Sequence, residues 1–312
     1  MTMITDVGAL LADGLSDNLV DGGVGCHGIR CEEAMVSRRR ARVLAGALVL
    51  ACLVLLGPSG PTGSLFGDTS LSVEEPVDVV PNRVMTWNIC NPCEESNVNR
   101  AAEIAASAPQ VVGLQEACVR DVERIRDHLR YRYGLVYRVE YGTVLRNWGR
   151  CGGLPWSPGA YGQAVLSASP MTDVVDVEYP DGGSEDRGYM AVTTTVGDRS
   201  VRVFNTHLAE RRQEAVRAQQ TGVLAAEVAR HDRAIVLGDF NAVPDTPELA
   251  RMWTLAADAD PECGPSPTGD CEVTTDWQSK FDYIFLRGVV ALGHRVRPTP
   301  YSDHHPLRAD LN

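Results

Sequence analysis

The strongest constraint on the fold is an apolar, strand-like run that ends in a polar pair. Ala234–Leu237 is typical of a buried strand, and Gly238 marks its end. Asp239 and Asn241 follow, two positions apart. In extended backbone, residues i and i+2 point to the same side, so this carboxylate and carboxamide would face one point. Open α/β sheets bind ligands at such strand ends. An Asx turn that merely closes the strand is the alternative.

The same arrangement recurs along the chain. The other runs are Val84–Trp87 before Asn88, Val111–Gln115 before Glu116, Val201–Thr206 before His207, Phe281–Phe285 around Asp282, and Tyr301–Pro306 around Asp303 and His304. Each contains or ends in a side chain that can bind a metal or transfer a proton. These side chains can converge only if the strands lie side by side in packed sheets.

Six short motifs carry a resemblance to a known family. In chain order they are TWN, LQE, NTHL, GDFN, FDYIF and SDHHP. Together they resemble the endonuclease/exonuclease/phosphatase superfamily, which includes DNase I-like nucleases, abasic-site nucleases, inositol-polyphosphate 5-phosphatases and bacterial sphingomyelinases. The resemblance spans about residues 82–312 and is closest to a secreted bacterial member. It implies a DNase I-like α/β fold, a four-layer sandwich of two packed mixed β-sheets flanked by helices.

The region before this domain has the pattern of an export signal. Arg38–Arg42 precedes the apolar run Val43–Leu56, and Gly57–Gly63 is rich in small residues and proline. The apolar run is shorter than the roughly 20 residues that span a bilayer, which favours a cleaved signal peptide over an anchor. Either form predicts an extracytoplasmic domain. The expected organisation is a disordered or misassigned extension at 1–34, a signal peptide or signal anchor at 35–63, a linker at 64–80, and a catalytic domain at 81–312.

Cysteine usage agrees with export. Of nine cysteines, six lie in the predicted domain: Cys90, Cys93, Cys118, Cys151, Cys263 and Cys271. An even number in an exported chain predicts disulfides, here up to three. Cys263 and Cys271 flank a Gly/Pro-rich loop and are the best-supported pair, while the other pairings stay open. A zinc site at Cys90 and Cys93 is the rival interpretation, although a second ligand pair is missing at the usual spacing.

The charge and the helical patterns add two constraints. The net charge of −12, with Lys280 as the single lysine, argues against a tight nonspecific nucleic-acid coat, but not against a nuclease with a local groove. Helices are expected at Asn97–Ala108, along an apolar stripe from Val119 to Leu129, at 210–230, and from an N-cap at Thr246 to about Ala257. Residues 142–162 are rich in Gly, Trp and Pro and are predicted to form a loop over the site.

The resemblance also implies a metal site. The family's main metal ligand matches Glu116, and the matching Asn88 supports the metal and the phosphate. These hard oxygen ligands suit Mg²⁺, with Mn²⁺ or Ca²⁺ as alternatives. Asp303 is expected to hold the metal through water or to assist the leaving group.

The remaining motif residues suit phosphate-ester hydrolysis, in which a water must be activated and the phosphoryl charge neutralised. Asp239 is expected to orient and deprotonate the attacking water, and Asn241 to hold the phosphate and the nucleophile. His207 and His304 can donate to phosphoryl oxygens, the latter oriented by Asp282.

Structural alternatives remain for several of these residues. His207 could be a buried core histidine, Glu116 could pair with an arginine of the following helix, and His294 and His305 are expected to be structural or at the surface. Abasic-site nucleases carry an acid two residues after the motif asparagine, where this chain has Cys90. That departure weakens the abasic-nuclease interpretation.

The sequence therefore predicts a monomeric, exported, Mg²⁺-dependent phosphodiesterase. Its substrate would be a nucleic acid or a phospholipid headgroup, so nuclease and phospholipase C/sphingomyelinase-like activities both stay open. The membrane would be contacted only through an uncleaved N-terminal segment. The alternative is a non-catalytic domain that keeps the fold and binds a phosphorylated ligand.

Overall fold

The computed structural model describes residues 76–93, 95–210, 212–266 and 271–312. The predicted segments 1–34 and 35–63, and most of the linker 64–80, lie outside these residues. The described end of that linker is attached to the domain, because the Val77 amide donates to the Tyr133 carbonyl (2.9 Å) and the Val80 amide to the Ala108 carbonyl (2.8 Å). Within the described ranges, no helix is both long and apolar enough to cross a membrane.

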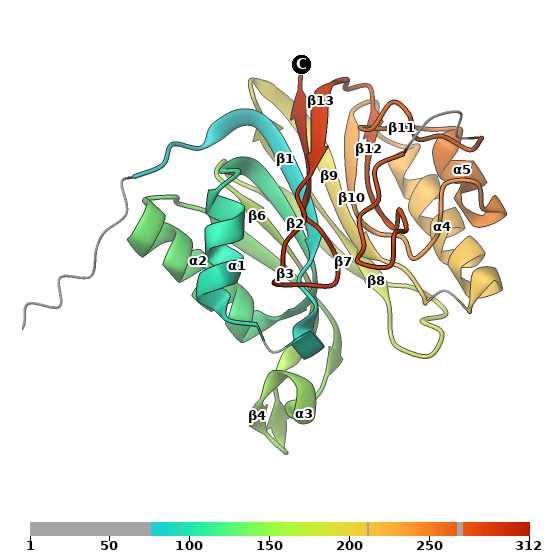
Figure 1. Cartoon of the computed structure of the whole chain (residues 1–312). Coiled ribbons are helices and arrows are strands. Elements are labelled where there is room, and N and C mark those ends of the chain that lie inside the picture. The colour runs from blue at the N-terminus through green and yellow to red at the C-terminus, as the bar shows by residue number, and fades with distance from the viewer. Residues whose placement is uncertain (1–75, 94, 211, 267–270) are drawn as a thin grey trace, which may run out of the picture. The chain divides into compact units, whose positions relative to one another are not determined.

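Two six-stranded sheets form the centre of the domain (Figure 1). The first has the order β13-β14-β1-β2-β6-β3, and its strands are β1 Val80–Asn88, β2 Pro109–Cys118, β3 Arg138–Arg146, β6 Ala160–Ser167, β13 Ala291–Val296 and β14 Leu307–Leu311. The second has the order β11-β12-β10-β9-β8-β7, and its strands are β7 Thr172–Glu178, β8 Gly188–Val196, β9 Arg199–His207, β10 Ala234–Asp239, β11 Ala257–Asp258 and β12 Asp282–Arg287. Both sheets are mixed, since β1–β2 and β9–β10 are parallel pairs within otherwise antiparallel sheets.

Three apolar cores separate four layers. The middle core lies between the sheets and joins residues such as Val84 of the first sheet to Ile235 of the second. On the outer face of the first sheet, Trp87 packs with α1 (Asn97–Ala105) and α2 (Val119–Tyr133). The outer face of the second sheet packs with α4 (Glu214–Val228) and α5 (Ala250–Trp253). The predicted fold class, two packed mixed sheets flanked by helices, is confirmed.

Strand alternation places polar strand ends between the sheets. In β1, Val84 belongs to the middle core, so Asn88, four residues later, faces the same side. In β10, Ile235 and Leu237 face the middle core, and Asp239 continues their side. By the same period, His207 of β9 faces the first sheet. The apolar core thus gives way to a polar centre at one end of the interface between the sheets.

The amide of Asn205 joins the two sheets beside that centre. Asn205 is fully buried in β9, and its Nδ2 donates across the interface to the Leu114 carbonyl (3.0 Å) and the Ala164 carbonyl (2.9 Å). Its Oδ1 accepts from Gln115 Nε2 (2.6 Å). The facing residue is Gly113, where an added Cβ would lie 2.8 Å from Asn205 Oδ1. A glycine is needed there because the sheets approach too closely for a side chain.

Several helix boundaries differ from the predicted ones. α1 ends at Ala105, not Ala108, since the chain turns before Pro109 begins β2. At the helix that was predicted to begin after Thr246, the Thr246 hydroxyl donates to the Val243 carbonyl (2.8 Å) and does not cap the following amides. A 3-10 turn, η2 (Pro247–Leu249), leads into α5, which ends at Trp253 because the chain is recruited into the edge strand β11.

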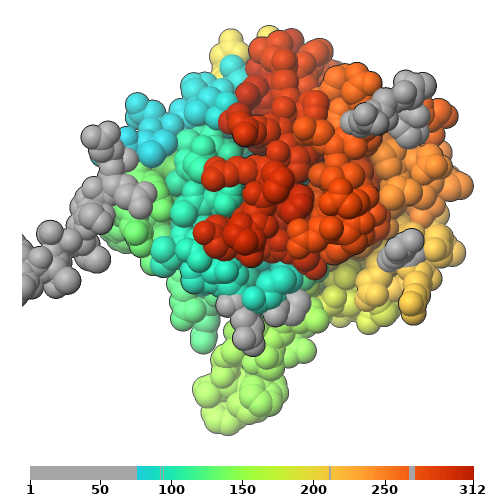
Figure 2. All heavy atoms as spheres, in the orientation of Figure 1, coloured from blue at the N-terminus to red at the C-terminus, as the bar shows by residue number. Residues whose placement is uncertain are grey.

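The predicted loop at 142–162 is wrong in its conformation. Residues up to Arg146 extend β3, and Ala160 already begins β6. Between them lie α3 (Trp148–Cys151) and a two-stranded hairpin, β4 (Gly153–Leu154) and β5 (Ser157–Pro158). The glycines and prolines that indicated a loop instead shape this compact excursion, which projects from the domain in Figures 1 and 2.

All six domain cysteines form disulfides. The predicted Cys263–Cys271 bond is confirmed. The pairings that the sequence left open are Cys90–Cys93 and Cys118–Cys151. The zinc interpretation of Cys90 and Cys93 is wrong for this structure, because their sulfurs are bonded to each other.

We expect Asn205→Ala to lower the free energy of unfolding by about 1–3 kcal/mol or more, because it leaves two buried carbonyls and the Gln115 amide without their partner. Chemical denaturation with disulfides intact measures this loss. Ser200→Ala, at an exposed position of the same strand, is the matched control and should change stability by less than about 0.5 kcal/mol. Equal effects of the two substitutions would contradict the role of the Asn205 amide.

Candidate active site

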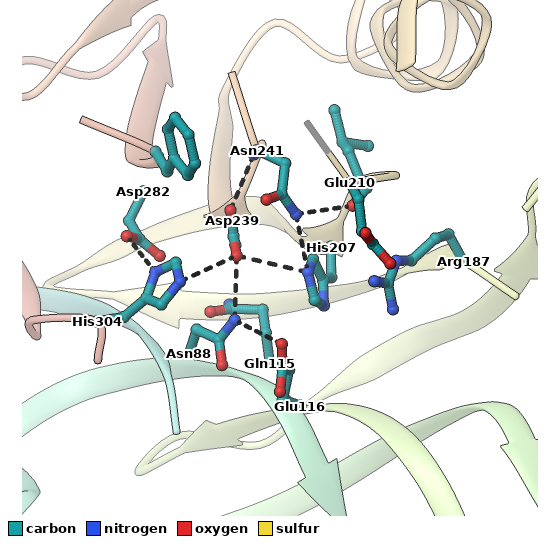
Figure 3. A network of polar contacts seen from close by, with 12 residues as sticks. Asn88, Gln115, Glu116, Arg187, His207, Glu210, Asp239, Asn241, Asp282 and His304 are labelled. Atoms are coloured by element: carbon teal, nitrogen blue, oxygen red, sulfur yellow. Dashed lines mark hydrogen bonds and ion pairs between the residues drawn. The ribbon is translucent and has the colours of Figure 1, made fainter. Parts of the chain in front are cut away.

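The polar strand ends of both sheets meet in one cluster (Figure 3). In the second sheet, Asp239 pairs in register with His207 of β9 on one side and Asp282 of β12 on the other. From the first sheet, Asn88 reaches across the interface, and its Nδ2 donates to Asp239 Oδ2 (3.0 Å) and Glu116 Oε1 (3.2 Å). The structure therefore brings together side chains that are far apart in the sequence.

Glu116 reaches this cluster through an irregularity in β2. Its neighbour Gln115 faces the middle core, where it donates to Thr86 Oγ1 (3.0 Å) and Asn205. Regular alternation would turn the next side chain to the opposite face. Glu116 instead has a φ of +52°, and the pairing of β2 with β6 shifts between Leu114 and Ala117. This bulge re-aims the carboxylate toward Asn88.

Asp239 and Asn241 are not in one extended segment, contrary to the sequence argument. β10 ends at Asp239, Asn241 has a φ of +50°, and its backbone amide donates to Asp239 Oδ1 (2.8 Å). The turn that the sequence offered as an alternative is therefore present. It still turns both side chains to one neighbour, because Asn241 Nδ2 lies 3.1 Å from His207 Nε2 and Asp239 Oδ2 lies 3.4 Å from the same nitrogen.

His304 is held between two carboxylates. Its Nδ1 lies 2.8 Å from Asp282 Oδ2, and its Nε2 faces Asp239 Oδ2 at 3.7 Å. Burial opposes a charge on the imidazole, but Asp282 and Asp239 outweigh that effect and raise the pKa of His304 to about 10. The Ser302 hydroxyl donates to the Asn88 carbonyl (2.8 Å) and accepts from the His304 amide (3.1 Å), which ties this loop to β1.

His207 has the opposite charge state. Burial, with the positive charges of Arg187, His304 and Arg150, holds the pKa of His207 well below its usual range, so the ring is neutral near pH 7. The alternative of a core histidine is correct in that His207 is buried. Its neighbours Asp239 and Asn241 nevertheless belong to the cluster, so His207 is not part of an apolar core. One cationic and one neutral imidazole thus flank Asp239.

Both central carboxylates are destabilised as anions. Burial raises the pKa of Asp239 to about 7, with Asp282 adding to the rise and His304 opposing it. Burial also raises the pKa of Glu116, partly offset by the Asn88 hydrogen bond and the charge of Arg187. Buried carboxylates of this kind gain stability from a bound cation. Groups that could hold a metal therefore exist here, with Glu116 and Asn88 on one side and Asp239, Asp282 and His304 within 4.8 Å of one another on the other.

The other predicted residues lie at the margin. The Asp303 carboxylate lies within 4.8 Å of the Cys90 and Cys93 sulfurs, and its charge contributes to the raised pKa of Glu116. His305 is buried, with its Nε2 3.6 Å from Asp276 Oδ1. His294 lies on β13, 3.5 Å from both Asp260 and Glu272, outside the cluster.

Sequence reasoning missed a basic group beside the cluster. Arg187, directly before β8 and only 4% exposed, pairs with Glu185 (2.7 Å), which also pairs with Arg150. Among the described residues, Arg187 Nε has no hydrogen-bond partner. The charge of Arg187 reaches both Glu116 and His207. A single arginine before a strand has no distinguishing signal in a sequence where nearly all basic charge is arginine.

Comparisons with known proteins agree with this fold. The model of the Endonuclease/Exonuclease/phosphatase family matches residues 85–304. A search of curated proteins found no significant match. Among solved structures, an endonuclease/exonuclease/phosphatase from Beutenbergia cavernae is 22% identical with a TM-score of 0.61, covering 74% of this chain and 71% of that chain. The human Nocturnin catalytic domain with bound sulfate is 22% identical with a TM-score of 0.59, covering 74% and 93%. D. rerio TDP2 complexed with a single-strand DNA product is 17% identical with a TM-score of 0.59, covering 74% and 98%. At these identities the structures show a common fold.

We expect Asp282→Asn to lower the pKa of His304 in metal-free protein, because it removes the carboxylate that stabilises the imidazolium. In the wild type the ring should stay protonated until the pH rises through about 10. NMR titration of the imidazole resonances measures this. Asp276→Asn, beside His305, is the control and should leave His304 unchanged. A His304 resonance that titrates identically in Asp282→Asn and the wild type would show that the pair does not set its charge.

Proposed function

Because this chain belongs to the endonuclease/exonuclease/phosphatase family, whose model matches residues 85–304, we propose that it is a metal-dependent phosphodiesterase. Members of this family are hydrolases that act on phosphoester bonds. The observation that carries the proposal is the convergence of Asp239, His304 and Glu116 from both sheets on one buried point. The reaction would be an in-line attack of water on the phosphorus.

Glu116 and Asn88 would hold the metal, which we propose to be Mg²⁺. The fit rests on hard oxygen donors and on a carboxylate that burial leaves poorly stabilised as an anion. Asn88 is already hydrogen-bonded to both Glu116 and Asp239, so it can hold a metal that is bound to Glu116 close to Asp239. When bound, the cation supplies Lewis-acid stabilisation of negative charge on phosphoryl oxygens. Asp303, beside the Cys90–Cys93 disulfide, would act through water.

Asp239 would orient and deprotonate the attacking water. Its Oδ1 accepts a hydrogen bond from the backbone amide of Asn241 (2.8 Å), while its Oδ2 faces Asn88, His207 and His304. A base must be fixed in place to take a proton along one direction, and these contacts fix it from both sheets. Its position in the buried end of the interface also limits competing water.

The cationic and amide donors around Asp239 would bind the phosphoryl group. His304, kept protonated by Asp282, can donate through Nε2 to an anionic oxygen. Neutral His207 and the Asn241 amide offer further polar contacts on the other side of Asp239. Arg187 adds positive charge and has a free Nε donor among the described residues.

The substrate is a phosphodiester, either a nucleic acid or a phospholipid headgroup. The single-strand DNA product in D. rerio TDP2 supports a nucleic-acid substrate, and the sulfate bound to the human Nocturnin catalytic domain is a tetrahedral anion like a phosphate group. Three disulfides among the described residues, together with the export pattern at 35–63, support a site of action outside the cytoplasm.

We expect Mg²⁺-dependent hydrolysis of bis-(p-nitrophenyl) phosphate, plasmid DNA or sphingomyelin by the disulfide-intact protein, and its loss with EDTA. Asp239→Asn should lower kcat by about 10²–10⁴-fold, because the base is lost. His304→Ala should lower kcat by about 10²–10³-fold, because a donor to the transition state is lost. Steady-state kinetics on the three substrates measure both effects.

His128→Ala on α2 is the matched control and should keep wild-type kcat. Phosphorylated ligands that bind without any turnover of the three substrates would favour the alternative, a non-catalytic domain that keeps the fold.

Glu116→Gln should weaken Mg²⁺ or Mn²⁺ binding by about tenfold or more, because it removes the only full negative charge contributed by the Glu116–Asn88 pair. Isothermal titration of the metal into EDTA-stripped protein measures this without any turnover. Glu140→Gln, outside the cluster on β3, serves as the control. Unchanged affinity in Glu116→Gln would move the metal site elsewhere.

A further inference from the structure

A compact excursion between β3 and β6 has no part in the mechanism above. We call residues 147–159 the protrusion. It consists of α3 and the β4–β5 hairpin, and it projects from the domain near the end where β1 and β2 terminate (Figures 1 and 2). The chain could pass from β3 to β6 with a short turn, since these strands are antiparallel neighbours. The residues of the protrusion are therefore not needed to connect the two strands.

The protrusion is internally ordered. Asn147 caps α3, since its Oδ1 accepts from the Arg150 amide (3.0 Å), and its own amide donates to the Gly159 carbonyl (3.0 Å). The Gly159 amide donates to the Gly152 carbonyl (2.8 Å). An added Cβ on Gly159 would lie 2.3 Å from the Cys151 carbonyl oxygen, so the end of α3 and the residue after β5 fit closely. A rigid surface loses little conformational entropy when it binds a ligand.

A disulfide ties the protrusion to the catalytic centre. Cys151 is bonded to Cys118, which lies two residues after Glu116 on β2. The adjacent Arg150 packs its guanidinium 4.4 Å from the centre of the Tyr161 ring and pairs with Glu185. Its positive charge contributes to the lowered pKa of His207. Arg150 therefore lies at the base of the protrusion and within electrostatic range of the centre.

The protrusion exposes large apolar side chains beside cationic ones. Trp148 is 59% exposed and Trp156 is 80% exposed, with Leu154 at 50%. From Arg146 to Tyr161 the sequence holds two arginines and no acid, although the whole chain carries a net charge of −12. Glu185 is shared between Arg150 and Arg187, so this group keeps an excess of positive charge. Exposed indoles with interleaved arginines match a polyanion that has aromatic faces.

We propose that the protrusion is a stacking platform for an unpaired nucleic-acid strand, whose bases stack on Trp148 and Trp156 while a phosphate next to the scissile one pairs with Arg150. This inference rests on the proposed phosphodiesterase function and names its substrate class. A strand carries a phosphate at every nucleotide, so it can place one at Asp239 and His304 and another at Arg150. A phospholipid headgroup with a single phosphate would offer Arg150 no second phosphate. Stacking needs no particular base, so cleavage would show little sequence preference.

The test compares the wild type with the double variant Trp148→Ala/Trp156→Ala on two substrates. For a short oligothymidylate, the double variant should raise KM about tenfold or more, because two stacked bases lose their partners. For bis-(p-nitrophenyl) phosphate, which has no neighbouring nucleotide, kcat/KM should be unchanged. Tyr131→Ala is the matched control, because Tyr131 is an equally exposed aromatic residue (69%) near the far end of α2, about 18 Å along the helix from its first turn. It should behave as the wild type on both substrates.

A binding measurement separates this inference from the activity. In EDTA, the fluorescence anisotropy of a labelled oligothymidylate should rise as the wild-type protein binds it, and about tenfold more of the double variant should be needed for half-saturation. Arg150→Gln should reduce the salt dependence of the same binding, because one phosphate contact is lost.

The outcomes are distinct. A protein that turns over no substrate but shows the expected difference in oligothymidylate binding would refute the proposed function and support the platform. A double variant that cleaves and binds oligothymidylate like the wild type would overturn the platform while leaving the phosphodiesterase intact. A loss confined to hydrolysis of sphingomyelin vesicles would overturn it in favour of a lipid-docking role.

Discussion

The structure depends on two sheets being held face to face with their polar strand ends in register. The Asn205 amide, bonded to two carbonyls of the opposite sheet, is a polar connection buried in that interface, and Gly113 provides the room for it. Apolar packing between the sheets is strong but not directional, so it would tolerate a sliding motion. Directional bonds fix the register, and a shift of the sheets by even one residue would separate Asn88 from Asp239.

The electrostatics of the centre follow from the same burial. Burial raises the pKa of Asp239 and of Glu116, and the nearby positive charges of His304 and Arg187 offset that rise only in part. The two histidines diverge because their partners differ. His304 faces two carboxylates and stays cationic, while burial, helped by the charge of Arg187, lowers the pKa of His207 and keeps it neutral. An acceptor for a proton, a cationic donor and a neutral donor are therefore arranged around one point, which is the requirement for moving a proton while stabilising phosphoryl charge.

Local sequence patterns predicted the strands well, but they predicted the end of a helix and the conformation of a connecting segment poorly. The buried run before Asp239 and the chain reversal at Asn241 both follow from residue type. The end of the helix after Pro247 does not follow from residue type, because the pairing of β11 with β12 competes for the residues that would extend the helix. The stretch 142–162 has the glycines and prolines of a loop, yet the Cys118–Cys151 bond and backbone pairing make it an ordered excursion. In each case a long-range contact overrode a local preference.

By itself, the sequence determined which side chains are candidates for the chemistry, because the motifs place Asn88, Asp239 and His304 in or at the ends of strand-like runs whatever the topology. It also determined the layered α/β class, through alternation and resemblance. Only the tertiary structure decided how these residues meet. The bulge that turns Glu116 inward, the pairing of Asp282 with His304 and the placement of Arg187 depend on contacts between strands distant in the chain, and residue type and spacing do not encode such contacts.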